Sequence, residues 1–323
     1  MGEGGLFDSF CCCEESKGLE SVREVVDSHV HFSGVGGLTS KFHDAAYFGE
    51  GAKRRDAYTE EEFEIQAVAC GLDVDRCVFV ECMLGDAVAE ASWALERCRS
   101  HDSKIGAVVA HAPAPDGGDA VEEFLRRLPG CDAHRKPAGL AGGRVVLLGD
   151  PMPHKFACLD PLYGEGLGAL HARGLHWEWC CRPESLPAVA TQSSRFPDMT
   201  FVLDHCGHNA GGDDFKTWSR DVAALADRCP NILCKLGASE EWGLQSEKPG
   251  QFIKHAISVF GADRCLYESN FFVGHAAHGL AYDHAARLTY DALAGGQPGC
   301  CDDEDAVALV FAGNAKRVYG LGY

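Results

Sequence analysis

Two histidines lie close together in an apolar, β-branched run that reads Val-Val-Asp-Ser-His-Val-His-Phe. Because side chains alternate along a strand, we expect Asp27, His29 and His31 to share one face. Two imidazoles on one strand are good ligands for a divalent metal. In a chain with 15 His, the pair is equally compatible with two packed or surface histidines.

A third histidine of interest follows the apolar run Phe201-Val-Leu. Gly207 comes soon after His205, so we expect this imidazole at the C-terminal end of a strand. The alternative is a histidine satisfied in the core or by Asp204. His208 lies just beyond, where it could contact a leaving group or a substrate carboxylate.

A carboxylate stands in another apolar run, Arg-Cys-Leu-Tyr-Glu-Ser-Asn-Phe-Phe. Strand alternation predicts that Glu268 and Asn270 share a face, with Asn270 nearer the end of the strand. Burying a carboxylate is costly unless it is paired. Glu268 is therefore expected to be either functional or held by a cation.

The elements that must position these residues are short apolar runs bounded by Gly, Pro, Asp or Asn. Such runs are typical of buried parallel strands. Eight are found: Val25–Phe32, Cys77–Leu84, Ile105–Ala110, Arg144–Leu148, Leu175–Cys181, Thr200–His205, Ile232–Leu236 and Cys265–Asn270.

Amphipathic segments separate most of these runs. They are Glu60–Cys70 with Thr59 as N-cap, Ala87–Arg99, Ala120–Leu128, Ser185–Arg195, Phe215–Arg228, Pro249–Phe260 and Tyr282–Ala294. Eight strands that alternate with helices predict an α/β protein with one (β/α)8 TIM-barrel domain over residues 23–323. An open doubly wound sheet is the rival, but the Gly-rich phosphate loop of many such sheets is missing. Residues 1–22 are expected to form a flexible arm, and residues 33–59 a candidate lid.

Composition narrows the function classes. The chain has 323 residues and a formal net charge of −19, which opposes binding to nucleic acid or to an anionic membrane surface. No apolar run approaches the ~18 residues of a membrane span. The 17 Cys are odd in number and lie mostly in apolar runs, which favours reduced thiols in a cytoplasmic protein. The role of Cys11–Cys13 stays open.

Several motifs together resemble the amidohydrolase-related family of metal-dependent TIM-barrel hydrolases, which includes sugar-lactone and pyrone-dicarboxylate lactonases. They are the opening Asp-Ser-His-Val-His, the Asp-His-Cys-Gly at 204–207, the Asn-Ile-Leu-Cys-Lys-Leu at 231–236, the Tyr-Glu-Ser-Asn-Phe at 267–271, and the closing Phe-Ala-Gly-Asn-Ala-Lys-Arg-Val-Tyr-Gly-Leu at 311–321. The resemblance runs over nearly the whole chain. It implies a barrel with its site at the strand C-termini.

The resemblance also implies a metal site. Carried over, His29, His31 and His205 fill the three histidine positions, and one divalent ion such as zinc or manganese is implied, although some lactonase members work without metal. Where the family usually has Asp on the eighth strand, this chain has Asn270. An amide cannot act as a general base. We therefore hypothesise that Glu268 replaces that Asp as the catalytic base.

Substrate anchors are less specific. Arg144 begins the fourth apolar run and Arg182 follows the fifth, and a guanidinium can bind a substrate carboxylate through two hydrogen bonds. Each is as compatible with a structural arginine. Lys235 is expected either to point inward and polarise a carbonyl or to point outward to a helix carboxylate.

The function that these features favour is hydrolysis of a lactone or similar activated acyl substrate, with a small carboxylate or lactone as partner and a homo-oligomer as one possible assembly. A metal-assisted decarboxylase of a small acid is the second enzymatic class. The third alternative is a catalytically inactive ligand-binding barrel, because Asn270 removes the usual carboxylate.

Overall fold

The computed structural model of the chain describes residues 18–38, 57–133, 135–148, 153–207, 214–237, 249–294 and 304–322. Within these ranges, no helix is long and apolar enough to cross a membrane. The arm expected over residues 1–22 is described only from residue 18, where Leu19–Ser21 form a short turn. Cys11–Cys13 and most of the candidate lid lie outside the described residues, so these expectations stay predictions.

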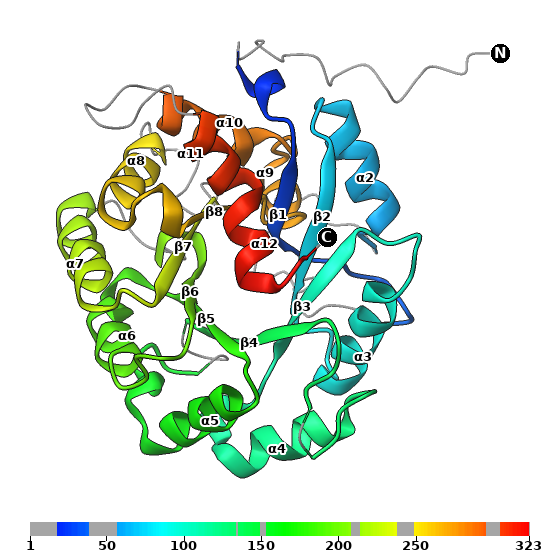
Figure 1. The fold of residues 1–323 in the computed structure, drawn as a ribbon, viewed down its shortest axis with the longest axis vertical. Helices are drawn as coiled ribbons and strands as arrows, with labels where there is room; N and C mark the ends of the chain where they lie inside the picture. Colours follow the sequence, from blue (N-terminus) through cyan, green and yellow to red (C-terminus); the bar gives the residue numbers. More distant parts are fainter. Residues whose placement is uncertain are drawn as a thin grey trace.

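Eight parallel strands pair in sequence order, and the helices surround them (Figure 1). Backbone contacts join the last strand segment to the first: the Asn270 N–H donates to the His29 carbonyl at 3.1 Å, and Val30 bridges to Phe271. The predicted (β/α)8 barrel is confirmed. The strands are β1 (Val25–Val30), β2 (Val74–Val80), β3 (Ile105–His111), β4 (Leu140–Leu147), β5 (His176–Cys181), β6 (Phe201–Leu203), β7 (Ile232–Leu236) and β8 (Cys265–Tyr267).

The helices form the outer layer. Thr59 caps α2 as predicted, because its side chain accepts from the Glu62 N–H at 3.3 Å. The α-helices of the described residues are α2 (Glu60–Ala69), α3 (Ala87–Cys98), α4 (Gly118–Arg127), α5 (Pro161–Ala172), α6 (Leu186–Ser193), α7 (Phe215–Arg228), α8 (Pro249–Phe260), α9 (Val273–His278), α10 (His284–Ala294), α11 (Glu304–Ala308) and α12 (Asn314–Tyr319).

The last helix closes one end of the barrel. In Figure 1, α12 lies across the ring of strands, and its Ala315 and Tyr319 pack in one cluster with inward-facing Val26 and Val78. A Cβ on Gly106, near the start of β3, would meet the Leu321 side chain, so α12 covers the N-terminal end of the strands. The opposite, C-terminal end is the barrel mouth, where barrel enzymes place their active sites.

Only the seventh strand prediction is right at both ends, and the others are wrong by one to four residues; the second strand, for example, is Val74–Val80 rather than Cys77–Leu84. The fourth strand begins at Leu140 rather than Arg144, since Gly142 and Gly143 read as a break although they lie within the strand. The sixth ends at Leu203 and the eighth at Tyr267. Beyond these ends His205 and Asn270 have φ of 54° and 52°, a left-handed conformation that a strand cannot continue.

Candidate active site

The first strand presents its two histidines inward but not its aspartate. The pairing of β1 with β2 shifts register between Asp27 and Val30, as a bulge does. Asp27 accepts hydrogen bonds from the Ser269 N–H at 3.0 Å and from the Tyr282 hydroxyl at 2.8 Å. The Tyr282 ring contacts Phe63 of α2, so Asp27 faces the helix layer. The prediction that Asp27 shares the face of His29 and His31 is therefore wrong.

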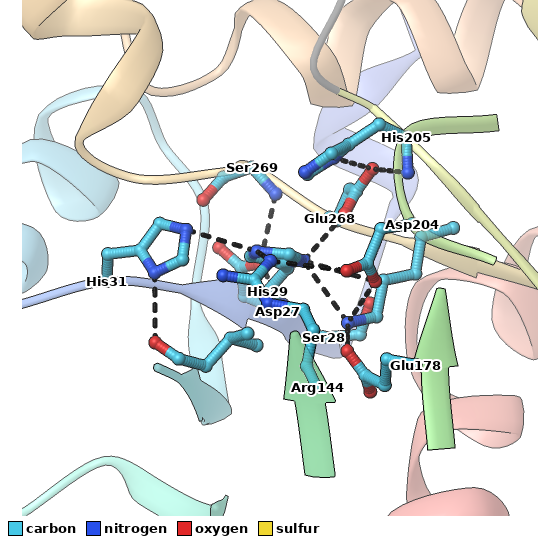
Figure 2. A network of polar contacts seen from close by, with 12 residues as sticks. Asp27, Ser28, His29, His31, Arg144, Glu178, Asp204, His205, Glu268 and Ser269 are labelled. Atoms are coloured by element: carbon cyan, nitrogen blue, oxygen red, sulfur yellow. Dashed lines mark hydrogen bonds and ion pairs between the residues drawn. The ribbon is translucent and has the colours of Figure 1, made fainter. Parts of the chain in front are cut away.

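Three imidazoles meet at the mouth. The Nε2 atoms of His29 and His31 are 3.1 Å apart, and the ring centroids of His29 and His205 are 4.7 Å apart. Each of the three side chains is at most 2% exposed. Figure 2 shows His205 and Glu268 side by side above His29. The structure therefore brings together the three histidines that the sequence predicted as a group.

Each imidazole has its Nδ1 atom beside an oxygen acceptor. His31 Nδ1 donates to the Val80 carbonyl at 2.9 Å, and His205 Nδ1 donates to Glu268 Oε1 at 2.9 Å. His29 Nδ1 lies 3.1 Å from Glu268 Oε2. Because a carbonyl or a carboxylate can only accept, the ring hydrogen sits on Nδ1 in neutral His31 and His205. Their Nε2 atoms are then left with a lone pair, whereas His29 Nδ1 also lies 3.2 Å from Lys235 Nζ.

A dense set of buried charges surrounds these rings. Arg144 Nε lies 3.0 Å from Glu81 Oε1 and Arg144 Nη1 lies 3.2 Å from Asp204 Oδ2. Lys235 Nζ lies 2.6 Å from Glu178 Oε2 and 3.1 Å from Asp204 Oδ1. Together with Glu268 the network holds two cations and four carboxylates, all at most 2% exposed. It therefore carries two uncompensated negative charges when the histidines are neutral.

The charges fix the protonation states of the network. Burial raises the pKa of Glu268, but His205 and then His29 outweigh burial and lower the pKa to about 2. Burial also raises the pKa of Asp204, yet Lys235 and His29 hold it well below its usual value. Burial, His29 and Arg144 all lower the pKa of His31, so its imidazole is neutral at pH 7. Both carboxylates are ionised at that pH.

The predicted substrate anchors have different environments. Lys235 points inward and is fully buried, which decides between the two orientations left open by the sequence. Arg144 is 2% exposed and already bound to Glu81 and Asp204. Arg182 is half-buried, and its Nε atom donates to the Leu148 carbonyl at 3.3 Å. His208 lies outside the described residues.

Strand alternation does not orient Glu268 and Asn270, because β8 ends before both residues. The expectation that they share a strand face is therefore wrong. Asn270 is 1% exposed and lines a small cavity with Gln66 and Tyr282. Glu268, in contrast, points toward the histidines, as its contacts with His205 and His29 show.

The donor set fits one divalent cation. His29, Asp204 and His205 offer ligand atoms that all lie within 4.8 Å of one another. Two imidazole nitrogens bound to one zinc ion lie ~3.3 Å apart, close to the separation of the His29 and His31 Nε2 atoms. The two uncompensated negative charges fit a 2+ ion as well. Arg144 Nη1 lies 3.1 Å from His29 Nε2, so a cation there requires the guanidinium to move away.

Sequence reasoning missed two carboxylates of this network. Glu81 directly follows the apolar run of β2, and Glu178 stands between two tryptophans in β5. A lone carboxylate in or beside a buried apolar run is itself a signal, since it must be paired. Asp204 was seen only as a partner of His205. In the structure, Asp204 instead contacts Arg144, Lys235 and His29.

Comparison with known proteins identifies a matching family and two related sequences. A family model described as amidohydrolase matches residues 26–321. L-fucono-1,5-lactonase from Burkholderia ambifaria is 30% identical over 170 residues, which cover 50% of this chain and 56% of that protein. Protein y4mH from Sinorhizobium fredii, which is uncharacterised, is 25% identical over 186 residues, or 56% of this chain and 61% of that protein. The chain thus matches only about three fifths of the length of these curated relatives.

A solved structure shows the same fold. The crystal structure of an amidohydrolase from Burkholderia multivorans with bound zinc superposes with a TM-score of 0.74 at 22% identity, and the alignment covers 92% of this chain and 99% of that one. The family model extends over nearly every strand and helix described above. On that match, this chain belongs to the amidohydrolase family.

Proposed function

We propose that the chain is a hydrolase that opens a lactone or a related ester by water attack at the barrel mouth. The observation that carries the proposal is the group of three buried imidazoles, in which Glu268 holds His205 through its Nδ1 atom at 2.9 Å. Ester hydrolysis needs a group that takes a proton from water and a group that polarises the carbonyl. The likeness to L-fucono-1,5-lactonase supports a lactone as the substrate class.

A divalent cation fits the site, and His29, His31 and His205 would hold it. Nitrogen donors favour zinc over manganese. When bound, such a cation polarises a carbonyl and lowers the pKa of a bound water. The solved amidohydrolase from Burkholderia multivorans with bound zinc is a precedent for zinc in such a barrel.

In the metal-free protein, His205 Nε2 is the atom that accepts the proton of the attacking water. Glu268 fixes the His205 ring, because Glu268 Oε1 accepts from both the Nδ1–H and the backbone N–H. Both oxygens of Glu268 face imidazoles and the side chain is fully buried. We therefore assign Glu268 to positioning His205 rather than to contact with water. Arg144 and Lys235 hold Asp204 and keep the buried charges in place.

The test is a panel of 1,4- and 1,5-lactones of aldonic acids, assayed by acid release with and without a chelator. The elemental content of the same sample is measured. We expect turnover of at least one lactone and its loss in His205→Gln. Turnover that survives chelation assigns the chemistry to the imidazoles alone. Carbon dioxide release from an aromatic acid, with no lactone opened, would replace the hydrolase by a decarboxylase.

A further inference from the structure

Opening a lactone requires a proton for the leaving alkoxide as well as a base for water, and this inference rests on the hydrolase function proposed above. The imidazole group at the mouth can accept protons but does not offer one. His31 and His205 commit their Nδ1 hydrogens to the Val80 carbonyl and to Glu268, and His29 Nδ1 faces Glu268. The base itself can return the water's proton, as a triad histidine does, but an acid already at the leaving group makes that transfer unnecessary.

His111 stands where such an acid would act. It is the last residue of β3, at the C-terminal end. Ala107 and Val109 belong to the inner barrel cluster, so strand alternation turns His111 inward at the mouth. Its side chain is 37% exposed, whereas the three clustered histidines are at most 2% exposed. His111 is thus open to a ligand that enters the mouth.

A carboxylate lies behind the ring. His111 Nδ1 is 3.6 Å from Glu81 Oε2, and the other oxygen of Glu81 is held by Arg144 at 3.0 Å. Burial lowers the pKa of His111, but Glu81 and then Glu90 outweigh burial and the opposing charge of Arg144, and they raise the pKa. Glu81 stays ionised, because Arg144 outweighs its burial and lowers its pKa to about 2. Glu81 and Glu90 therefore favour the protonated form of His111.

Its strand also places it on another side of the mouth from the base. In the order β1 to β8, His111 on β3 and His205 after β6 are three strand positions apart in a ring of eight. A scissile carbonyl between them would have the water side toward β6 and the leaving oxygen toward β3. Both imidazoles have a carboxylate behind Nδ1, Glu268 for His205 and Glu81 for His111.

Other proton donors in the described part of the mouth are committed elsewhere. Lys235 is fully buried between Glu178 and Asp204. The Tyr282 hydroxyl donates to Asp27 in the helix layer. The Cys180 thiol is 2% exposed and contacts the His205 imidazole, so it faces the base.

We propose that His111 is the general acid of the ring-opening step, donating its Nε2 proton to the leaving alkoxide. The water oxygen bonds to the carbonyl carbon and gives its proton to the imidazole group. The bond from that carbon to the ring oxygen breaks, and the ring oxygen takes the proton of His111. The products are the carboxylic acid and the hydroxyl of the open chain, and exchange with solvent resets both histidines.

The test is the leaving-group dependence of a His111→Gln variant. The two substrates are the best 1,5-lactone of the panel and the 4-nitrophenyl ester of the same acyl group, whose leaving group needs no proton. We expect kcat for the lactone to fall ~10²-fold or more, and kcat for the nitrophenyl ester to stay within about threefold. KM is expected to change little. His171→Asn, an exposed histidine on α5, is the matched control and should leave both rates unchanged.

Two outcomes would overturn the assignment. Equal loss of kcat on both substrates would make His111 structural, and no loss on the lactone would make another group the acid. Circular dichroism and the unfolding midpoint of the variant identify a folding defect. In that case, the losses of kcat on the lactone and on the nitrophenyl ester are compared in His111→Asn. A wild-type protein that hydrolyses neither substrate would reject the proposed hydrolase itself, which is a different result.

Discussion

His205 and Glu268 form a two-point contact: one carboxylate oxygen accepts from the His205 Nδ1–H at 2.9 Å and from its backbone N–H at 3.1 Å. The contact holds a non-glycine residue at a φ of 54°, in the left-handed region. Such a conformation persists only where its surroundings hold it. Glu268 therefore fixes both the position of the backbone and the tautomer of the ring, as the carboxylate of a catalytic triad does.

Glu268→Gln should separate the contribution of the Glu268 charge to kcat from that of its side-chain size. The amide keeps the size of the side chain, but its nitrogen cannot accept and its oxygen carries no charge. We expect kcat for lactone hydrolysis to fall ~10²- to 10⁴-fold, as when a triad carboxylate becomes an amide. The measurement is kcat together with its pH profile.

Glu268→Asp is the matched control, since it retains the charge and shortens the reach. If Glu268 positions His205, kcat of the wild-type protein falls at low pH with the pKa of an imidazole. The Asp variant then shows the same pH dependence with a lower maximal kcat. If Glu268 is itself the base, kcat falls with the pKa of the carboxyl group instead. A Gln variant with wild-type kcat would contradict both roles.

Lys235 should be essential to stability because it lies between two buried carboxylates. Its Nζ atom is 2.6 Å from Glu178 and 3.1 Å from Asp204, and all three side chains are fully buried. Removing one partner of such a network leaves uncompensated charge. We expect Lys235→Met to lower the free energy of unfolding by ~3–5 kcal/mol in urea titrations.

The double variant Lys235→Met/Glu178→Gln tests the cause. It removes one charge of each sign, so we expect it to be more stable than the sum of the single changes predicts. Additive losses would show that lost packing, and not charge balance, explains the effect.

The overall fold was predictable because buried parallel strands read as short apolar runs and each is followed by a helix. Ile232–Leu236 and Phe215–Arg228 were predicted at both ends. The helix α5 (Pro161–Ala172) was missed, since its three glycines, at positions 164, 166 and 168, weaken the helical pattern. A Cβ on Gly166 would meet the Ala114 backbone, so packing between neighbouring segments overrides the propensity there.

Site residues were predictable only where they belong to a short sequence motif. His29, His31 and His205 stand at strand ends, and their convergence follows from the barrel. Glu81 and Glu178 were not predicted, because their roles depend on Arg144 and Lys235 arriving from other strands. The orientation of Asp27 could not be predicted either, since a one-residue register shift decides which way it faces.

Zinc should stabilise the folded protein through the histidine cluster. A ligand that binds only the folded state adds ~2.7 kcal/mol when its concentration is 100 times its Kd. We expect zinc to raise the unfolding midpoint of chelator-treated protein, and His31→Asn to remove most of that rise. His31 suits the test because its ring is neutral and its Nδ1 is already bonded to Val80.

His171→Asn is again the control, because this exposed histidine lies on α5 away from the mouth. It should leave the zinc effect intact. A midpoint that does not respond to zinc in the wild-type protein would contradict the proposed cation site and leave the imidazoles to act alone.

Glu90 is a buried carboxyl group whose charge opposes folding. On α3, it accepts from the backbone N–H groups of Cys82 and Leu84. Burial raises its pKa, Glu81 adds to the rise, and the pKa reaches about 7 against an ordinary 4.5. A raised carboxyl pKa favours the folded state while the group is protonated. This contribution is full below pH 4.5 and is lost as the pH rises through 7.

Glu90→Gln should remove that pH dependence, because the amide does not titrate. The variant keeps only one acceptor oxygen for the two N–H groups, so it loses a constant amount of stability at every pH. We expect the stability difference, wild type minus variant, to fall by ~3 kcal/mol between pH 4.5 and pH 8. Urea unfolding at both pH values measures it, and Glu96→Gln on the same helix is the control. A difference that stays constant with pH would show that Glu90 is already ionised at pH 4.5, with its two backbone donors outweighing burial.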